Sequence, residues 1–194
     1  MIIAIEGRDG VGKSTQAKLL VQKWIDAGGG AAYVKSPSNA GLGLTYKLIY
    51  KMLNNGLARK HPILFQGFFT LNRILWALFV KPFMFRTHLF VMDRWTLSME
   101  IYGYREGVPR FFLKFFSWLC LKPDLTIVLD GKSHLDVRGK NDVYEQDGHL
   151  QEIVSSDYLN AVNNVDVFIE NGNGTIEEVH ENIITRVLRF ASKL

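Results

Sequence analysis

The stretch 7–15 restricts what this chain can fold into more than any other part of the sequence. It reads Gly-Arg-Asp-Gly-Val-Gly-Lys-Ser-Thr and matches the phosphate-binding pattern G-x-x-x-x-G-K-[ST]. The apolar run 1–6 before it is typical of a buried strand, and residues 16–27 after it carry apolar side chains at helical spacing. A loop of this kind between a strand and a helix predicts a phosphate-binding site in an α/β protein.

The residue types of this loop suit a polyphosphate. Glycines let the backbone wrap closely around phosphate oxygens with its N–H groups pointing inward, and the first turn of the next helix adds unpaired N–H groups and a positive dipole end. We expect Lys13 to reach the β- and γ-phosphates of ATP and the Ser14 hydroxyl to coordinate Mg²⁺. The residues expected to form the ATP-binding loop are Gly7, Arg8, Asp9, Gly10, Val11, Gly12, Lys13, Ser14 and Thr15.

Composition limits the class of protein. With 47% hydrophobic and 22% charged residues, the 194-residue chain is typical of a soluble globular protein, and its length predicts one domain, 1–194. Its single cysteine, Cys120, excludes an intramolecular disulfide, and the first residues already belong to the first predicted strand, so we expect a cytoplasmic location. The net charge of +4 suits a polyphosphate ligand, whereas the scattered lysines and arginines favour no nucleic-acid partner.

The apolar stretch 63–85 is long enough to suggest a membrane span. However, Asn72 and Arg73 lie near its centre, where a charge in a lone spanning helix is costly, and Pro62 and Pro82 bracket a shorter helix. We therefore expect a buried helix with one functional arginine, and no membrane partner. The apolar face predicted for this helix consists of Leu64, Phe68, Leu71 and Leu75.

Apolar strands and helices alternate along the whole chain, which predicts an α/β fold with a five-stranded parallel sheet covered by helices on both faces. Ligands of such sheets bind beyond the carboxyl ends of the strands. The predicted strands are 1–6, 31–35, 89–93, 125–129 and 165–169. The residues that follow them include the loop 7–15, Ser36 and Pro37, Asp93 and Arg94, Asp130, and Asn171.

Two of these residues have the chemistry of a phosphoryl-transfer site. Asp93 ends an apolar strand, where an enzyme with this loop needs its Mg²⁺-associated carboxylate. The alternative is an acid that caps the next helix. Arg94 can pair with a phosphate through two parallel hydrogen bonds, and its alternative is a salt bridge to a neighbouring side chain.

At these positions the sequence resembles a thymidylate kinase of the nucleoside monophosphate kinase superfamily, over nearly its whole length. The matching motifs are the loop at 5–16, Pro37, the segment Phe69-Thr70-Leu71-Asn72-Arg73, Asp93-Arg94 followed by Ser98 and Tyr102, Pro123-Asp124-Leu125-Thr126 with Asp130, and a lid at 131–147 that contains Arg138-Gly139-Lys140-Asn141-Asp142 and Glu145. Their combination, in this order, is much more specific than any one of them.

The resemblance implies the three-layer P-loop kinase fold and a role for each matching residue. Asp9 contacts the acceptor's sugar or the donor–acceptor junction, Phe69 stacks on its base, Arg73 holds its phosphate, Tyr102 faces its deoxyribose, and Arg94 lies near the phosphate. The implied catalytic residues are Asp9, Lys13, Arg94 and Arg138. The implied substrate-binding residues are Asp9, Pro37, Phe69, Arg73, Arg94, Ser98 and Tyr102. Arg138, Lys140 and Asn171 join the ATP-binding loop, and Ser14 and Asp93 bind the metal.

The cation that stabilises the transition state is expected in the segment 131–147. Some thymidylate kinases carry an arginine in the loop directly after its acid, where this chain has Gly10. Arg8 stands one position before the acid, and we expect its side chain to point to solvent. Arg138 is preferred over Lys140 because a planar guanidinium suits phosphate oxygens better than an ammonium does. The alternative is a solvated loop whose charges balance its own acids.

The expected reaction is transfer of the γ-phosphoryl group of ATP to dTMP, giving dTDP and ADP. A deoxynucleoside kinase is one alternative, and Arg73 discriminates against it, because a phosphate-binding arginine is needed only for a monophosphate acceptor. A nucleotide-binding protein with weak catalysis is another, while the lack of an N-K-x-D motif argues against a GTPase. The aromatic run 111–118 exceeds what one helix face can hide, and with the resemblance it predicts a homodimer packed through helices.

Overall fold

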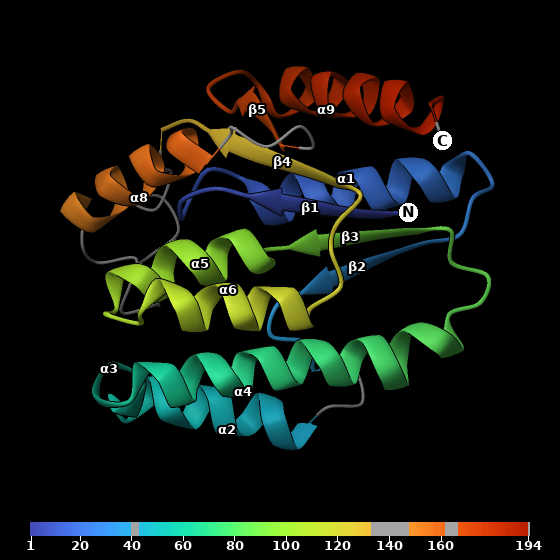
Figure 1. The fold of residues 1–194 in the computed structure, drawn as a ribbon. Helices are drawn as coiled ribbons and strands as arrows, with labels where there is room; N and C mark the ends of the chain where they lie inside the picture. Colours follow the sequence, from blue (N-terminus) through green and yellow to red (C-terminus); the bar gives the residue numbers. More distant parts are fainter. Residues whose placement is uncertain (40–42, 133–147, 162–166, 194) are drawn as a thin grey trace.

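The core of the fold is a five-stranded sheet in which every strand pair is parallel (Figure 1). The structure is a computed structural model, and it describes residues 1–39, 43–132, 148–161 and 167–193. The strand order is β2-β3-β1-β4-β5, so the strand that precedes the phosphate-binding loop is central. The strands are β1 (Ile2–Glu6), β2 (Ala31–Lys35), β3 (Leu89–Asp93), β4 (Leu125–Asp130) and β5 (Val167–Asn171).

Helices cover both faces of this sheet, as the alternation of elements predicts (Figure 1). Successive side chains of a strand point to opposite faces, so Ile3 and Ile5 pack under α1 and α9, while Ile2 and Ala4 pack with Trp76 and Trp95 on the other face. The helical segments are α1 (Lys13–Asp26), α2 (Gly43–Asn54), α3 (Leu57–Lys60), α4 (Pro62–Leu75), η1 (Trp76–Val80), η2 (Lys81–Phe83), α5 (Thr96–Arg105), α6 (Arg110–Leu119), α8 (Gly148–Asn160) and α9 (Ile176–Ala191).

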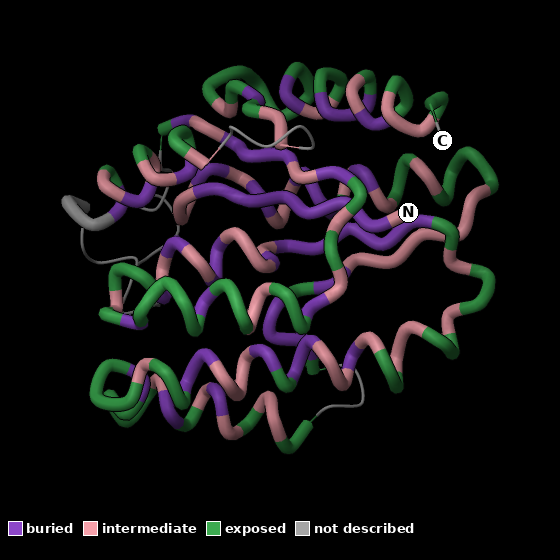
Figure 2. Tube along the Cα trace, viewed as in Figure 1, coloured by how far each residue is buried: buried purple, intermediate pink, exposed green. Residues whose placement is uncertain are grey.

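The buried face of α4 differs from the predicted one. Leu64 and Leu71, predicted to face the core, are 56% and 41% exposed. Figure 2 shows buried, intermediate and exposed positions following one another along this helix. The helix instead buries its polar side chains, because these face the loop after β2 and the start of α5, where they find backbone partners. The buried residues of α4 are Phe65, Gln66, Thr70, Asn72 and Arg73.

The segment Pro62–Phe83 is long and apolar enough to cross a membrane by length and composition, and 33% of its most apolar window is buried. Core helices of soluble proteins pass the same test, so this finding alone is weak. Here the segment packs against α2 and α6 and carries the buried Asn72 and Arg73.

Candidate active site

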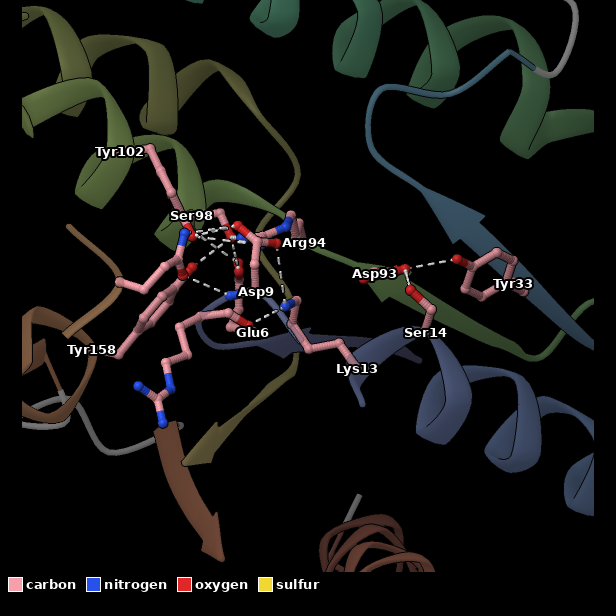
Figure 3. A network of polar contacts seen from close by, with 12 residues as sticks. Glu6, Asp9, Lys13, Ser14, Tyr33, Asp93, Arg94, Ser98, Tyr102 and Tyr158 are labelled. Carbon is pink, nitrogen blue, oxygen red and sulfur yellow. Dashed lines mark hydrogen bonds and ion pairs between the residues drawn. The ribbon is translucent and has the colours of Figure 1, made fainter. Parts of the chain in front are cut away.

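The carboxyl ends of β1 and β3 bring the phosphate-binding loop and Asp93 together (Figure 3). Gly7 has φ +133°, and a Cβ there would lie 2.4 Å from the Leu129 carbonyl oxygen, so only glycine fits beside β4. Gly12 precedes α1 with φ 91° in the left-handed region. The loop therefore turns tightly into α1, and the first helical residues, Lys13 and Ser14, stand at the strand ends.

Asp9 is the centre of a polar network that joins the loop to α5 and α8 (Figure 3). It forms an ion pair with the Arg94 guanidinium, and its Oδ2 accepts a hydrogen bond from the Tyr102 hydroxyl at 3.0 Å. Gln151 of α8 donates to Oδ2 at 3.2 Å and accepts from the Asp9 N–H at 2.9 Å. Sequence analysis did not identify Gln151, because nothing in its local pattern signals a contact with the loop 142 residues away.

The charges of this network set its protonation. Burial alone would raise the pKa of Asp9, but the Arg94 and Lys13 charges outweigh it and lower that pKa to about 2. Burial, aided by the Arg94 charge, lowers the pKa of Lys13 to about 8. The ammonium of Lys13 donates to the Arg8 carbonyl oxygen and lies 4.0 Å from Asp9 Oδ1. Asp9 is thus ionised near neutral pH and orients the two cations beside it.

Asp93 faces the first turn of α1. Its Oδ2 accepts hydrogen bonds from Ser14 Oγ at 2.5 Å and from the Tyr33 hydroxyl at 2.7 Å. The ion pairs among the described residues involve Asp9, Asp157 and Glu170, and none of them reaches Asp93. Among the described residues Asp93 is therefore a buried carboxylate without a direct ion pair, beside a hydroxyl that can act as a metal ligand, and the charges of Lys13 and Arg94 act on it only from a distance.

Glu6, rather than Asp93, caps the helix that follows β3. Its Oε1 accepts the N–H groups of Trp95 at 2.8 Å and Ser98 at 3.3 Å, at the start of α5. A carboxylate stabilises the positive end of a helix in this way. Burial raises the pKa of Glu6 above its usual range, while bonds from Ser98 and Trp95 act against this. Sequence analysis missed this role, although an acid closing an otherwise apolar strand was a signal. The cap fixes the turn at Arg94, whose φ is 64°.

Arg73 is the opposite case, a buried cation that forms no direct ion pair with the described residues, although the charge of Glu6 acts on it from a distance. One terminal nitrogen donates to the Trp95 carbonyl oxygen at 3.0 Å and the other contacts the Met99 sulfur at 3.2 Å. Its Nε has no hydrogen-bond partner, and its guanidinium lies 5.4 Å from the centre of the Phe69 ring. Burial lowers the pKa of Arg73, yet a guanidinium stays protonated in proteins. The arrangement leaves this positive charge available to an anionic ligand.

Asn72 fixes the loop that contains Pro37. Its Oδ1 accepts the Ser38 N–H at 2.8 Å, and its Nδ2 donates to the Ser38 carbonyl oxygen at 2.9 Å and to Thr45 Oγ1 at 2.9 Å. The amide of Asn72 thus pairs with both backbone groups of one loop residue. Two neighbouring residues of α4 therefore have separate roles: Asn72 holds this loop, and Arg73 carries a buried positive charge.

Replacing Asn72 by alanine is expected to lower stability and loosen this loop. The change removes the partners of a buried N–H and a buried C=O, which costs about 1–3 kcal/mol of unfolding free energy. Denaturant unfolding measures this loss, and the KM for the acceptor should rise in parallel. Thr45→Val is the matched control, because it removes one acceptor and leaves both Ser38 bonds in place. Equal unfolding free energies for wild type and Asn72→Ala would show that the hydrogen bonds between Asn72 and Ser38 contribute nothing to stability.

Arg8 does not point to solvent, so that expectation is wrong. Its Nε and Nη2 donate to the Gly131 carbonyl oxygen at 2.9 and 2.5 Å. Gly131 directly follows β4, and the forked guanidinium satisfies its carbonyl with two hydrogen bonds. Arg8 therefore ties the phosphate-binding loop to the end of the neighbouring strand.

Comparison with known proteins identifies the family. The thymidylate kinase family model matches residues 5–183. The chain belongs to the thymidylate kinase family. A probable thymidylate kinase of Methanocaldococcus jannaschii is 30% identical, covering 95% of this chain and 94% of that protein, and one of Thermococcus onnurineus is 26% identical, covering 96% and 97%. The crystal structure of the Ehrlichia chaffeensis thymidylate kinase has the same fold, with a TM-score of 0.73 at 21% identity, covering 96% of this chain and 98% of that one.

Membership of the thymidylate kinase family makes this chain a phosphotransferase, and most of the expected site residues fall at one end of its sheet. Asp9, Arg94 and Tyr102 are in mutual contact, and the Ser98 hydroxyl joins them to the buried Glu6. Asn171 ends β5 and accepts two hydrogen bonds from Asn173, so it shapes the turn after that strand. The expected lid residues Arg138 and Lys140 lie outside the residues that the structure describes.

Proposed function

We propose that the chain transfers the γ-phosphoryl group of ATP to dTMP, as a single kinase domain over 1–194. One observation carries this proposal: among the described residues, two buried charges of opposite sign, Asp93 and Arg73, form no direct ion pair. Burying a lone charge is costly unless a ligand compensates it. A cation beside Asp93 and an anionic acceptor beside Arg73 together meet this need.

The donor side fits ATP with Mg²⁺. Hard oxygen ligands suit Mg²⁺, which keeps several waters and binds through one or two protein groups plus phosphates. Ser14 and Asp93 provide such a pair, and the described residues contain no group of three or more His, Cys, Asp or Glu that could hold a metal alone. The ion supplies charge neutralisation at the phosphates, while Lys13 and the loop N–H groups orient them.

The acceptor side fits a nucleoside monophosphate. Arg73 is proposed to bind the acceptor phosphate and Phe69, beside it, to stack on the base. Arg94, held by Asp9 and lying 5.0 Å from the centre of the Tyr102 ring, is proposed to meet the phosphate from the other side. Pro37 and Ser98 complete the proposed acceptor site. Catalysis would then consist of positioning and of charge stabilisation.

A coupled ADP-release assay tests this function. The enzyme is offered ATP with thymidine, dTMP, other nucleosides and other monophosphates. We expect turnover with dTMP and none above background with thymidine, because only a monophosphate can compensate Arg73. Equal rates with thymidine would favour the deoxynucleoside kinase, and tight nucleotide binding without turnover would favour a binding protein.

The catalytic cation is proposed to come from Arg138, with Lys140 as the second candidate, since the P-loop position after the acid is Gly10. Arg138→Ala is then expected to lower kcat strongly, while ATP affinity changes little, because the interaction forms mainly in the transition state. Steady-state kinetics and nucleotide titration measure the two effects. Near-normal kcat in both Arg138→Ala and Lys140→Ala would exclude the lid as the source of the charge.

We also propose a cytoplasmic homodimer without a membrane or nucleic-acid partner. On α6, Phe111 and Trp118 are 75% and 72% exposed, and α6 packs beside α4. Leu64 and Leu71 of α4 and Leu78 of its continuation η1 are exposed at seven-residue spacing.

The dimer prediction is tested by light scattering. Wild type is expected to scatter as a dimer and Trp118→Asp as a monomer, because a charge placed in an apolar interface stays unpaired. Leu188→Asp is the matched control, since Leu188 is also exposed but lies on α9, on the other side of the sheet. A monomeric wild type at high micromolar concentration would contradict the prediction.

A further inference from the structure

Asp93 has a partner that the proposed reaction does not itself require. Its Oδ2 accepts a hydrogen bond from the Tyr33 hydroxyl at 2.7 Å, in addition to that from Ser14 (Figure 3). Tyr33 belongs to β2, whose register pairs Tyr33 with Val91 and Lys35 with Asp93. Tyr33 and Asp93 therefore project from the same face of the sheet, and the carboxylate is held by β2 and by α1 at once.

Of the Tyr33 side chain, only the hydroxyl group makes the contact with Asp93. The ring packs against the apolar cluster under α1, and Lys18 Nζ lies 5.5 Å from its centre. A phenylalanine would fill the same space and keep both contacts. Tyrosine at this position thus adds one group, a donor that reaches Asp93, and its side chain is partly buried.

The two donors bind the same oxygen of the Asp93 carboxylate, which leaves the other oxygen for a ligand. Both hydroxyls bind Oδ2, and the hydrogen bonds of the described residues include none to Oδ1. A serine hydroxyl has one proton to donate and two lone pairs to accept, so Ser14 can hold Asp93 and still serve as a metal ligand. Tyr33 holds no metal itself. Its effect is to fix the carboxylate and leave Oδ1 available.

We propose that Tyr33 is a positioning residue of the metal site, acting through Asp93. This inference rests on the Mg²⁺ role proposed above. Groups that hydrogen-bond to a metal-associated carboxylate restrict its orientation, and their loss costs about 10–100-fold in metal affinity or activity. A carboxylate held by Ser14 alone can rotate about its own bonds, whereas a second donor from a different element fixes its plane.

The test separates metal binding from nucleotide binding, using the non-hydrolysable ATP analogue AMPPNP and calorimetry. Tyr33→Phe is expected to raise the half-saturating Mg²⁺ concentration of the AMPPNP complex about 10-fold, and to leave AMPPNP affinity in EDTA within about twofold. Tyr104→Phe, which removes a hydroxyl from a half-exposed tyrosine of α5, is the matched control and should behave as wild type. A purely structural role of Tyr33 would weaken both measurements alike.

A double variant shows whether Tyr33 acts through Asp93. Tyr33→Phe combined with Asp93→Asn should lose no more Mg²⁺ affinity than Asp93→Asn alone, because effects transmitted through one group are not additive. If Ser14→Ala and Asp93→Asn weaken Mg²⁺ binding but Tyr33→Phe does not, the inference about Tyr33 is wrong while the metal site stands. If none of the three changes Mg²⁺ binding, the proposed metal site fails and this inference fails with it.

Discussion

Replacing Arg73 by methionine is expected to weaken acceptor binding strongly without unfolding the protein. Truncating one partner of a desolvated charged contact costs about 2–5 kcal/mol, which corresponds to roughly 30- to 5,000-fold in the dissociation constant of dTMP. Part of this loss comes from the phosphate, which would then keep Arg94 as a proposed partner but lose the cation on the α4 side. ATP affinity should stay close to that of wild type, because Arg73 lies on α4, away from the phosphate-binding loop.

The substitution Arg73→Met should affect the stability of the protein and its acceptor binding in opposite directions. Without an acceptor, Arg73 is a buried charge with an unpaired Nε, and its burial opposes the charged form. Methionine fills much of the same space without that charge, so the unfolding free energy is expected to be unchanged or higher than in wild type. Arg86→Met is the matched control, because it removes an exposed arginine before the start of β3, at the end of the sheet opposite to the site. A strongly destabilised Arg73→Met would show that Arg73 is structural.

The strands and the site end of the sheet could be predicted because burial on both faces makes these strands continuous apolar runs. The predicted bounds 31–35 and 89–93 match β2 and β3, and β5 ends at Asn171, two residues beyond the predicted end. Ser14 and Asp93, each predicted as a metal ligand, lie within hydrogen-bond distance of each other. Thr175 and Glu178 form a capping box at the start of α9.

The failures share a physical cause. Hydrophobic periodicity assumes that apolar side chains face the core, but α4 buries Asn72 and Arg73 and exposes Leu64 and Leu71. The polar side chains of this helix find backbone partners in the loop after β2 and at the start of α5, and this reverses the usual pattern. The only sequence signal of this reversed pattern is Arg73 itself, because an arginine is not expected in an apolar core.

Contacts between distant segments were also beyond sequence reasoning. Glu6 caps a helix whose first residues lie about ninety positions later, and Arg8 binds the backbone of Gly131. Each depends on which strands are neighbours in the sheet, and the order β2-β3-β1-β4-β5 is not written in any local pattern. Once that order is known, the acid at the end of β1 stands directly beside the start of α5, and its role follows.

Replacing Lys13 by alanine is expected to remove phosphoryl transfer while the fold persists. Lys13 contributes the only charge within the loop that the motif places on the β- and γ-phosphates, and removing one preorganised donor from a developing negative charge costs about 10²–10³-fold in kcat. The fold should survive because burial disfavours the charged form of Lys13. The ammonium lies buried beside the Arg8 carbonyl oxygen, and this burial lowers the pKa of Lys13 to about 8. Single-turnover measurements with saturating ATP and dTMP isolate the transfer step from binding.

Two further variants control this experiment. Lys23→Ala, on the exposed side of the same helix, is the matched control and should transfer at the wild-type rate. Lys13→Met keeps the volume of the apolar stem if alanine leaves a cavity. Wild-type transfer by a folded Lys13→Met protein would remove the phosphate-binding loop from the mechanism, since no other residue of that loop can bring an ammonium to the transferred group.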